Sequence, residues 1–199
     1  MAYYIRILGK NPTPPALKDL QRAAEPGVIE SDQGVESEWN ELTLKHKAGE
    51  EIALIERNVV AQGELGAEEL EEFINEVADY KPASAATWLS EYLPNVKVIY
   101  AFQVLSGTET DDGWALLHQV YAAVWNAAGG ILQADGEGFS NEAGNTILWQ
   151  FSDGVTGDWN VGIIASAGQW LNFKMDIGSQ AHREAFWRGE LPVGAELIP

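Results

Sequence analysis

Apolar positions recur along this chain with two different spacings. Leu42 and Leu44 alternate with polar neighbours, and a period of two is typical of a strand with one buried side. In residues 65–78 apolar positions such as Leu70 and Phe73 return every three or four residues, and most residues between them are glutamates. That pattern predicts an amphipathic helix. The spacing therefore indicates a chain in which strands and helices alternate.

The same spacings predict a further set of elements, which fall into two similar series. We expect strands at residues 4–8, 28–30, 39–47, 52–60, 96–105, near 131, and at 146–151, 160–165 and 169–175. We expect helices at residues 13–24, 65–78, 83–93, 113–127 and 180–188.

Each series runs strand, helix, several antiparallel strands, helix, which predicts an α+β fold. We interpret the chain as two related β-α-β-β(-β)-α units, residues 1–94 and 95–199, that arose by duplication. The expected architecture is one or two antiparallel sheets with helices packed on one face, in a ferredoxin-like style. A single continuous domain is the alternative.

Composition and the lack of a long apolar stretch indicate where the protein is located, and they suggest no cofactor. Of the 199 residues 46% are apolar, which is enough for a sizeable core, and there is no cysteine for a disulfide or a thiolate. The apolar start of the chain is too short for a signal peptide, and no stretch reaches the length of a membrane-spanning helix. We expect a soluble, cytoplasmic protein without a cofactor.

The charge excludes some partners and favours others. With 30 Asp plus Glu against 12 Lys plus Arg, the formal net charge is −18. Such an excess of carboxylates repels nucleic acid and anionic membranes, and it attracts basic proteins. The segment Val98 to Phe173 has eight carboxylates and no Lys or Arg, so an anionic substrate finds no cation there. No phosphate-binding glycine motif and no Gly-x-Ser-x-Gly sequence is present.

One helix carries an aromatic stripe with two interpretations. Trp114, His118, Tyr121 and Trp125 fall at spacings of four, three and four, on one side of the helix at residues 113–127. Apolar residues occupy the neighbouring side, so the helix is apolar nearly all round and is expected to be buried. We therefore predict that the stripe belongs to the core, and a ligand-binding surface is the alternative.

A glycine-rich loop offers a pair of acids that could take part in catalysis or metal binding. Asp135 and Glu137 flank Gly136, and paired carboxylates serve glycoside hydrolysis or bind metal ions. The spacing fails the calcium-loop template, because Phe139 stands where an oxygen ligand is required. We expect a structural turn and no metal, and we keep a pocket near His118, Asp135 and Glu137 as an alternative.

Exposed acids and tryptophans are the candidates for partner contacts. Phe186 and Trp187 are adjacent in a predicted helix, so they cannot both face inward, and we expect one of them to be partly exposed or packed against residues 191–199. An exposed Trp187 would mark a contact surface. The full set of expected contact residues is Asp111, Asp112, Asp153, Asp158, Trp159 and Trp187.

These observations lead to three functional hypotheses. The first is a non-catalytic acidic binding domain, an inhibitor or immunity-like protein for a basic partner. The second is a small-molecule-binding domain or hydrolase that uses the pocket named above. The third is a structural or assembly module that forms a homodimer through a sheet edge or an exposed tryptophan. Acidity that serves only solubility is the fourth possibility.

Overall fold

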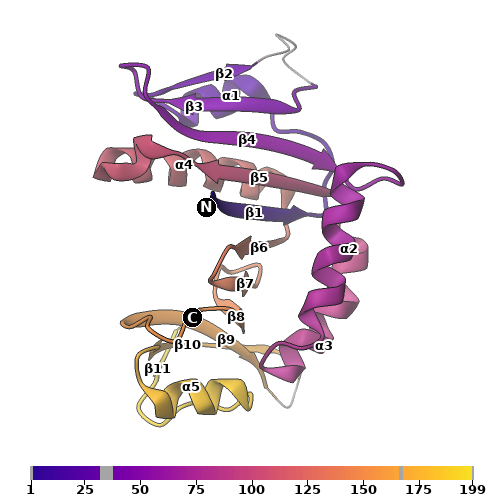
Figure 1. Ribbon diagram of the computed structural model, residues 1–199, viewed down its shortest axis with the longest axis vertical. Coiled ribbons are helices and arrows are strands. Elements are labelled where there is room, and N and C mark those ends of the chain that lie inside the picture. Colours follow the sequence, from indigo (N-terminus) through magenta and orange to yellow (C-terminus); the bar gives the residue numbers. More distant parts are fainter. Residues whose placement is uncertain (1, 32–37, 166–167, 199) are drawn as a thin grey trace. The chain divides into compact units, whose positions relative to one another are not determined.

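The computed structural model describes residues 2–31, 38–165 and 168–198 and shows an α+β fold (Figure 1). The chain divides into two compact units. Unit 1 contains Met1–Glu68 and Val96–Gly130, and unit 2 contains Glu69–Asn95 and Ile131–Pro199. Each unit is thus built from two separate segments. The predicted boundary at 94/95 lies one residue before the chain returns to unit 1.

Unit 1 contains an antiparallel sheet in the strand order β1-β5-β4-β3-β2. A turn around Gly49, whose φ is +100°, joins β3 to β4, and glycine adopts such a φ without strain. The strands are β1 Tyr3–Gly9, β2 Val28–Ser31, β3 Glu41–Lys45, β4 Glu51–Val59 and β5 Val98–Val104.

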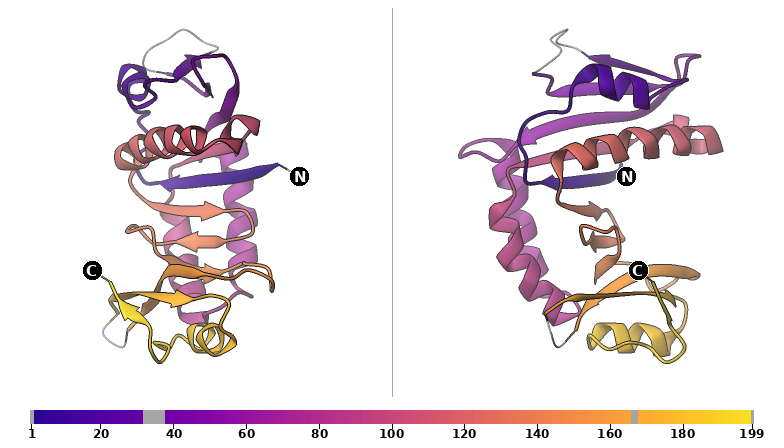
Figure 2. Two further views of the ribbon diagram at one scale, coloured as in Figure 1. Left: turned by 90° about the vertical axis from the view of Figure 1, so that its left-hand side faces the viewer. Right: turned by 180° about the vertical axis from the view of Figure 1, so that it is seen from behind.

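Two helices cover one face of this sheet, α1 (Leu17–Ala23) and α4 (Asp111–Ala128) (Figure 2, right). α1 buries Leu20 against the core. At Gly9 the sheet and α4 approach so closely that an added Cβ would lie 2.9 Å from the Ala128 Cβ. The helices and this face of the sheet enclose the core of unit 1.

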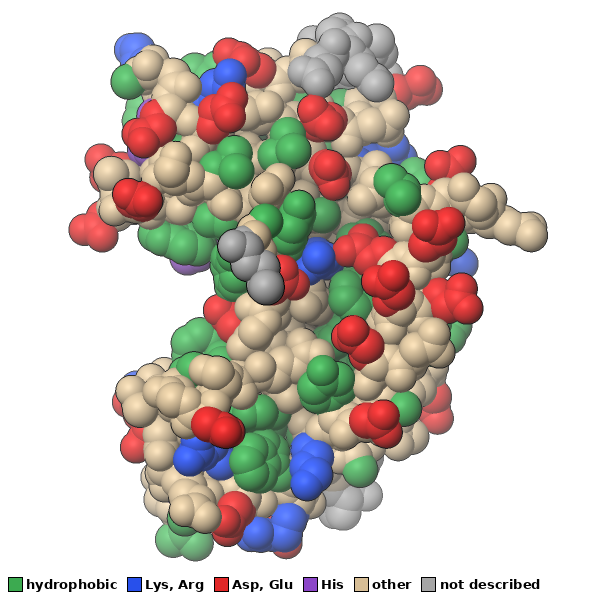
Figure 3. Space-filling model, viewed as in Figure 1, with side chains coloured by type: hydrophobic (Ala, Val, Ile, Leu, Met, Phe, Trp, Pro, Cys, Tyr) green, Lys and Arg blue, Asp and Glu red, His purple; other side chains and the backbone are tan. Residues whose placement is uncertain are grey.

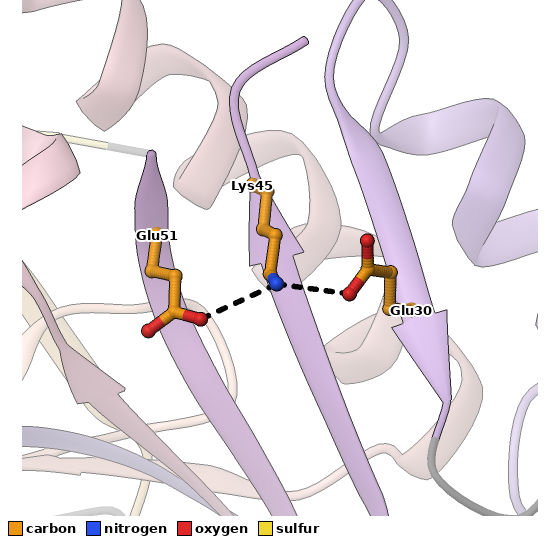
Figure 4. A network of polar contacts seen from close by, with 3 residues as sticks. All are labelled: Glu30, Lys45 and Glu51. Atoms are coloured by element: carbon orange, nitrogen blue, oxygen red, sulfur yellow. Dashed lines mark ion pairs between the residues drawn. The ribbon is translucent and has the colours of Figure 1, made fainter. Parts of the chain in front are cut away.

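The opposite face of the unit 1 sheet is polar around Lys45 (Figure 4). The Lys45 Nζ lies 2.9 Å from a Glu30 oxygen on β2 and 3.3 Å from a Glu51 oxygen on β4. Hydrogen bonds to Glu30 and then Glu51 raise the Lys45 pKa above its ordinary value. One cation is therefore shared between two carboxylates of its own sheet.

Unit 2 contains six described strands in sequence order, and their pairing is antiparallel except for a parallel contact between β8 and β9. The three-residue strand β7 lies between the strands that we expected near residue 131 and at residues 146–151. The strands are β6 Ile131–Ala134, β7 Gly138–Ser140, β8 Thr146–Trp149, β9 Asp158–Ile164, β10 Trp170–Asp176 and β11 Glu196–Leu197.

The helices of unit 2 contact both faces of its strands. α5 (Gln180–Trp187) buries Phe186 in a cluster that includes Phe173 of β10. Trp170 points to the opposite face of β10 from Phe173, and its ring centroid lies 5.0 Å from that of Trp88. Trp88 belongs to α3 (Ala83–Tyr92). α2 (Leu65–Val77) precedes α3 in the chain, and the boundary between the units falls within α2, after Glu68.

The structure confirms the α+β class and the mostly antiparallel pairing, and each of the five predicted helices is present. The ferredoxin-like detail is not confirmed, and packing of helices on one face holds for unit 1 only. Short 3₁₀ turns at Leu93–Asn95 and Ser106–Glu109 are the remaining helical elements of the described ranges. In those ranges no helix is both long and apolar enough to cross a membrane.

Candidate functional site

The first turn of α4 presents two exposed carboxylates. Thr110 caps the helix, since its Oγ1 accepts a hydrogen bond of 3.2 Å from the Gly113 N–H. Asp111 and Asp112 follow at the surface, where the positive end of the helix dipole favours them. Neither carboxylate forms an ion pair within the described ranges. Two expected contact residues are therefore adjacent, exposed and not neutralised.

α4 buries one side only, which corrects the expectation that its aromatic stripe belongs to the core. Trp114 is 37% exposed and His118 is exposed, while Tyr121 and Trp125 are partly buried. The side that faces the sheet consists of smaller residues, namely Gly113, Leu116, Leu117, Val120, Val124 and Ala128. A helix that is apolar nearly all round does not reveal from its sequence which side the sheet will cover.

The inner end of the stripe is held firmly to unit 1. The Tyr121 ring lies edge-on to Phe102 of β5 with 5.5 Å between ring centroids. The Trp125 Nε1 donates a hydrogen bond of 2.9 Å to the Gly130 carbonyl oxygen. At the outer end, 5.8 Å separates the ring centroids of Trp114 and His118. The rings thus form a row that is anchored at one end and open at the other.

A cavity of about 570 Å³ lies on the other flank of α4. Asp112 and Gln119 of α4 line it together with His46 and Glu50 from the connection between β3 and β4. The His46 Nε2 forms a hydrogen bond of 2.9 Å with the Gly107 carbonyl oxygen, which holds the ring in place. Sequence reasoning did not find this site, because its lining comes from three separate segments and no motif joins them.

The alternative pocket residues lie in different units. His118 belongs to unit 1, whereas Asp135 and Glu137 belong to unit 2. The two acids sit in the turn between β6 and β7, where the Glu137 N–H donates 3.1 Å to the Ala134 carbonyl oxygen. Gly136 at the centre of this turn has a φ of +73°. The segment is therefore a hairpin turn, and a pocket that combines these residues with His118 stays a prediction.

The other expected contact residues all lie in unit 2. Asp153 and Asp158 are exposed, and an Asp158 oxygen lies 3.0 Å from the Lys174 Nζ. This hydrogen-bonded pair raises the pKa of Lys174. Trp159 and Trp187 are partly buried and pack against the core cluster of unit 2. These tryptophans therefore have a packing role beside any contact role.

Several cations are paired with acids of the same chain. Besides Lys45 and Lys174, Arg22 lies 3.8 Å from Asp19 and Arg188 lies 2.9 Å from Glu190. By contrast α2, α3 and α4 contain no Lys or Arg, and several acidic side chains lie over α2 in the view of Figure 3. The carboxylates of these helices have no basic neighbour on the same helix.

Metal binding has no support in the part of the chain that the structure describes, since no group of three or more His, Asp and Glu side chains lies close enough to hold an ion. The other histidine, His182, uses Nδ1 to accept a hydrogen bond of 3.2 Å from the Asp176 N–H.

The candidate site is the surface of α4, with Asp111 and Asp112 at one end and the aromatic row along one flank.

Comparisons of the chain with protein-family models, with curated proteins and with solved structures find no significant match.

Proposed function

We propose that this chain is a non-catalytic binding protein that captures a basic protein, as an inhibitor or immunity-like protein does. The observation that carries the proposal is the first turn of α4, where Asp111 and Asp112 are exposed and form no ion pair within the described ranges. α2 and α3 likewise contain no Lys or Arg. Uncompensated carboxylates on a folded surface raise the association rate with a cationic partner and match a cationic surface.

The local role of these acids does not account for their number. A carboxylate in a first helical turn contributes on the order of 0.5 kcal/mol through the helix dipole, and one residue is enough for that effect. α4 carries two such residues, and α2, a separate helix, has exposed glutamates at Glu68, Glu71, Glu72 and Glu76. Charges of one sign repel each other and destabilise a compact chain, so a partner of opposite charge gives a reason for keeping them.

The proposal is tested by affinity capture followed by a defined binding measurement. A tagged chain is incubated at low salt with a lysate of the organism that makes it, and retained proteins are identified and purified. We expect one basic protein that binds with fixed stoichiometry and with an association rate that falls as salt increases. If no basic protein is retained at low salt and released at high salt, the proposal fails.

Two variants that each remove two negative charges provide the control for this measurement. Asp111→Asn with Asp112→Asn removes two charges from α4, and Glu71→Gln with Glu72→Gln removes two from α2. All four side chains are exposed, so both variants should fold. We expect the α4 pair to slow association with the purified partner more than the α2 pair does.

The cavity beside α4 supports a second candidate function, the binding of a small cationic molecule. Its volume of about 570 Å³ falls in the range of small-molecule sites, and Glu50 and Asp112 contribute two carboxylates to its lining against the cation of Lys47. The alternative that the sequence predicted is a ligand site or hydrolase pocket near His118, Asp135 and Glu137. A measurement of small-molecule binding to variants of the two histidines tests both sites. A ligand whose binding is lost in His46→Ala but kept in His118→Ala would assign binding to the cavity.

A further inference from the structure

We propose that Asp111 and Trp114 form a binding site for an arginine side chain of the basic partner. This inference rests on the proposed function and names the place on α4 where that partner is recognised. The two residues are three positions apart in one helix, a spacing that places side chains next to each other on the surface. A planar guanidinium can donate to the carboxylate and stack on the indole at the same time.

The geometry of α4 places this pair at the open end of the aromatic row. Asp111, Trp114, His118, Tyr121 and Trp125 follow at intervals of three, four, three and four, so the carboxylate lies in line with the rings. Trp114 is 37% exposed, and its ring contact with His118 leaves part of the indole open to a partner. A partner segment that runs along α4 would meet the acid first and then the rings.

The charge at this end of α4 favours a cation. The helix dipole contributes the equivalent of about half a positive charge at the first turn. Asp111 and Asp112 together contribute two full negative charges, and neither is paired in the described ranges. The carboxylates therefore outweigh the dipole, and the site attracts a cation in spite of its place at a helix N-terminus.

The site needs little rearrangement before it binds. Thr110 fixes the start of α4 by its hydrogen bond to the Gly113 N–H, and Gly113 packs so closely on Gly107 that an added Cβ would collide with the backbone. Further along, the Phe102 contact and the Trp125 hydrogen bond hold the row to unit 1. A pre-organised surface loses less conformational entropy on binding than a flexible one does.

The experiment measures the binding of a labelled octa-arginine peptide to the full chain by fluorescence anisotropy, with octa-lysine as the second probe. We expect Trp114→Ala to weaken octa-arginine binding about fivefold, the size of effect that loss of one cation–π contact produces. Asp111→Asn should weaken it by a similar factor. For octa-lysine the effect of Trp114→Ala should be smaller, because an ammonium group does not stack.

Matched controls separate this site from general charge attraction. Glu184→Gln removes one exposed carboxylate from α5, which is not part of the proposed binding surface, and should change octa-arginine binding less than twofold. The double variant Asp111→Asn with Trp114→Ala should lose less than the product of the two single effects, because both residues serve one guanidinium. Trp114→Gln repeats the test with a polar residue in case the alanine variant folds poorly, and the thermal midpoint of each variant reports its fold.

Two outcomes overturn the inference in ways that can be told apart from failure of the proposed function. If Asp111→Asn and Trp114→Ala weaken octa-arginine binding no more than Glu184→Gln does, recognition is not at this pair. If the two single effects multiply in full, the residues act independently and do not share a guanidinium. Either result leaves the capture of a basic protein standing, which only the affinity experiment can refute.

Discussion

Tyr100 on β5 contributes to stability through its ring and not through its hydroxyl. The side chain is fully buried, its ring centroid lies 5.7 Å from that of Trp39, and its hydroxyl has no hydrogen-bond partner among the described residues. Burial raises the pKa of the Tyr100 hydroxyl, and the charge and close approach of the Arg57 guanidinium lower it by smaller amounts. The two groups do not reach hydrogen-bond geometry, since the Arg57 Nε is also without a partner among the described residues. The ring therefore contributes to stability, and the hydroxyl adds little to it.

The first prediction compares two substitutions of Tyr100. We expect Tyr100→Phe to change the free energy of unfolding by less than about 1 kcal/mol, because it removes a hydroxyl without a partner. Tyr100→Ala should cost about 3–5 kcal/mol, since it leaves a cavity beside Trp39. Urea denaturation measures both changes. A loss above about 2 kcal/mol for Tyr100→Phe would show that the hydroxyl is bonded in the folded protein.

The raised pKa of Tyr100 also predicts how stability depends on pH. Above the ordinary pKa of 10.0 the unfolded chain loses the Tyr100 proton while the folded chain keeps it. The folded state then binds more protons than the unfolded state, so stability falls as pH rises from 10.0 towards the raised pKa. Lys45 and Lys174, also with raised pKa values, act in the same direction above 10.5.

Tyr100→Phe isolates one part of this alkaline loss. We expect the free energy of unfolding of the variant to fall less steeply than that of the unchanged protein above pH 10.0. Denaturation curves at a series of pH values give the two slopes. Equal slopes would mean that Tyr100 titrates alike in the folded and unfolded chains.

At the scale of elements, the end of α4 depends on a close approach between helix and sheet. Gly129 closes the helix with an N–H that donates 2.8 Å to the Trp125 carbonyl oxygen, and Gly130 follows with a φ of +101°. A Cβ on Gly130 would collide with the carbonyl oxygen of Leu8 on β1. The chain can turn from α4 back towards a strand only because this position has no side chain.

Gly130→Ala should therefore destabilise the fold by about 3 kcal/mol or more, through the sum of a backbone clash and an unfavourable φ. Gly136→Ala is the matched control, since Gly136 also has a positive φ, of +73°, but has nothing within 4 Å of the added Cβ. We expect the control to lose about 1 kcal/mol. Thermal or urea unfolding of both variants measures the difference, and equal losses would contradict the clash.

At the scale of the whole molecule, the formal net charge of −18 sets the response to salt. Repulsion between exposed carboxylates destabilises the folded chain, and salt screens it over a Debye length that shrinks to about 3 Å at 1 M. We expect the thermal midpoint to rise as sodium chloride is increased from about 20 mM to about 500 mM. A flat or falling midpoint would show that the acids are already balanced within the fold.

Self-association belongs to the same scale and stays a prediction. A homodimer through the exposed Trp114 would have to bring the acidic α4 surfaces of two copies together, which their charge opposes at low salt. We expect a monomer at low salt and, if a dimer forms, its growth with salt and its loss in Trp114→Ala. Sedimentation velocity over a range of protein concentrations measures this. A dimer that is strongest at low salt would exclude the α4 surface as its interface.

The sequence predicted those elements that are long enough to show a regular spacing of apolar residues within their own residues. α2, expected at residues 65–78 and found at Leu65–Val77, follows from a 3.6-residue period that needs no other part of the chain. Strands such as β3 follow from the equally local period of two at Leu42 and Leu44. β7 was missed, because its three residues Gly138–Ser140 are too few to show any period and its hairpin partners define it.

The tertiary structure decided which side of each element the rest of the chain covers. The sequence of α4 is apolar on adjoining sides, and the fold places the side with the smaller residues on the sheet, where Gly9 approaches Ala128 closely, and leaves Trp114 exposed. The cavity at His46 likewise exists because three distant segments fold together. Period is a property of neighbours along the chain, whereas burial depends on contacts between residues far apart in it, so the sequence determined the elements and the charge while the fold determined the surface.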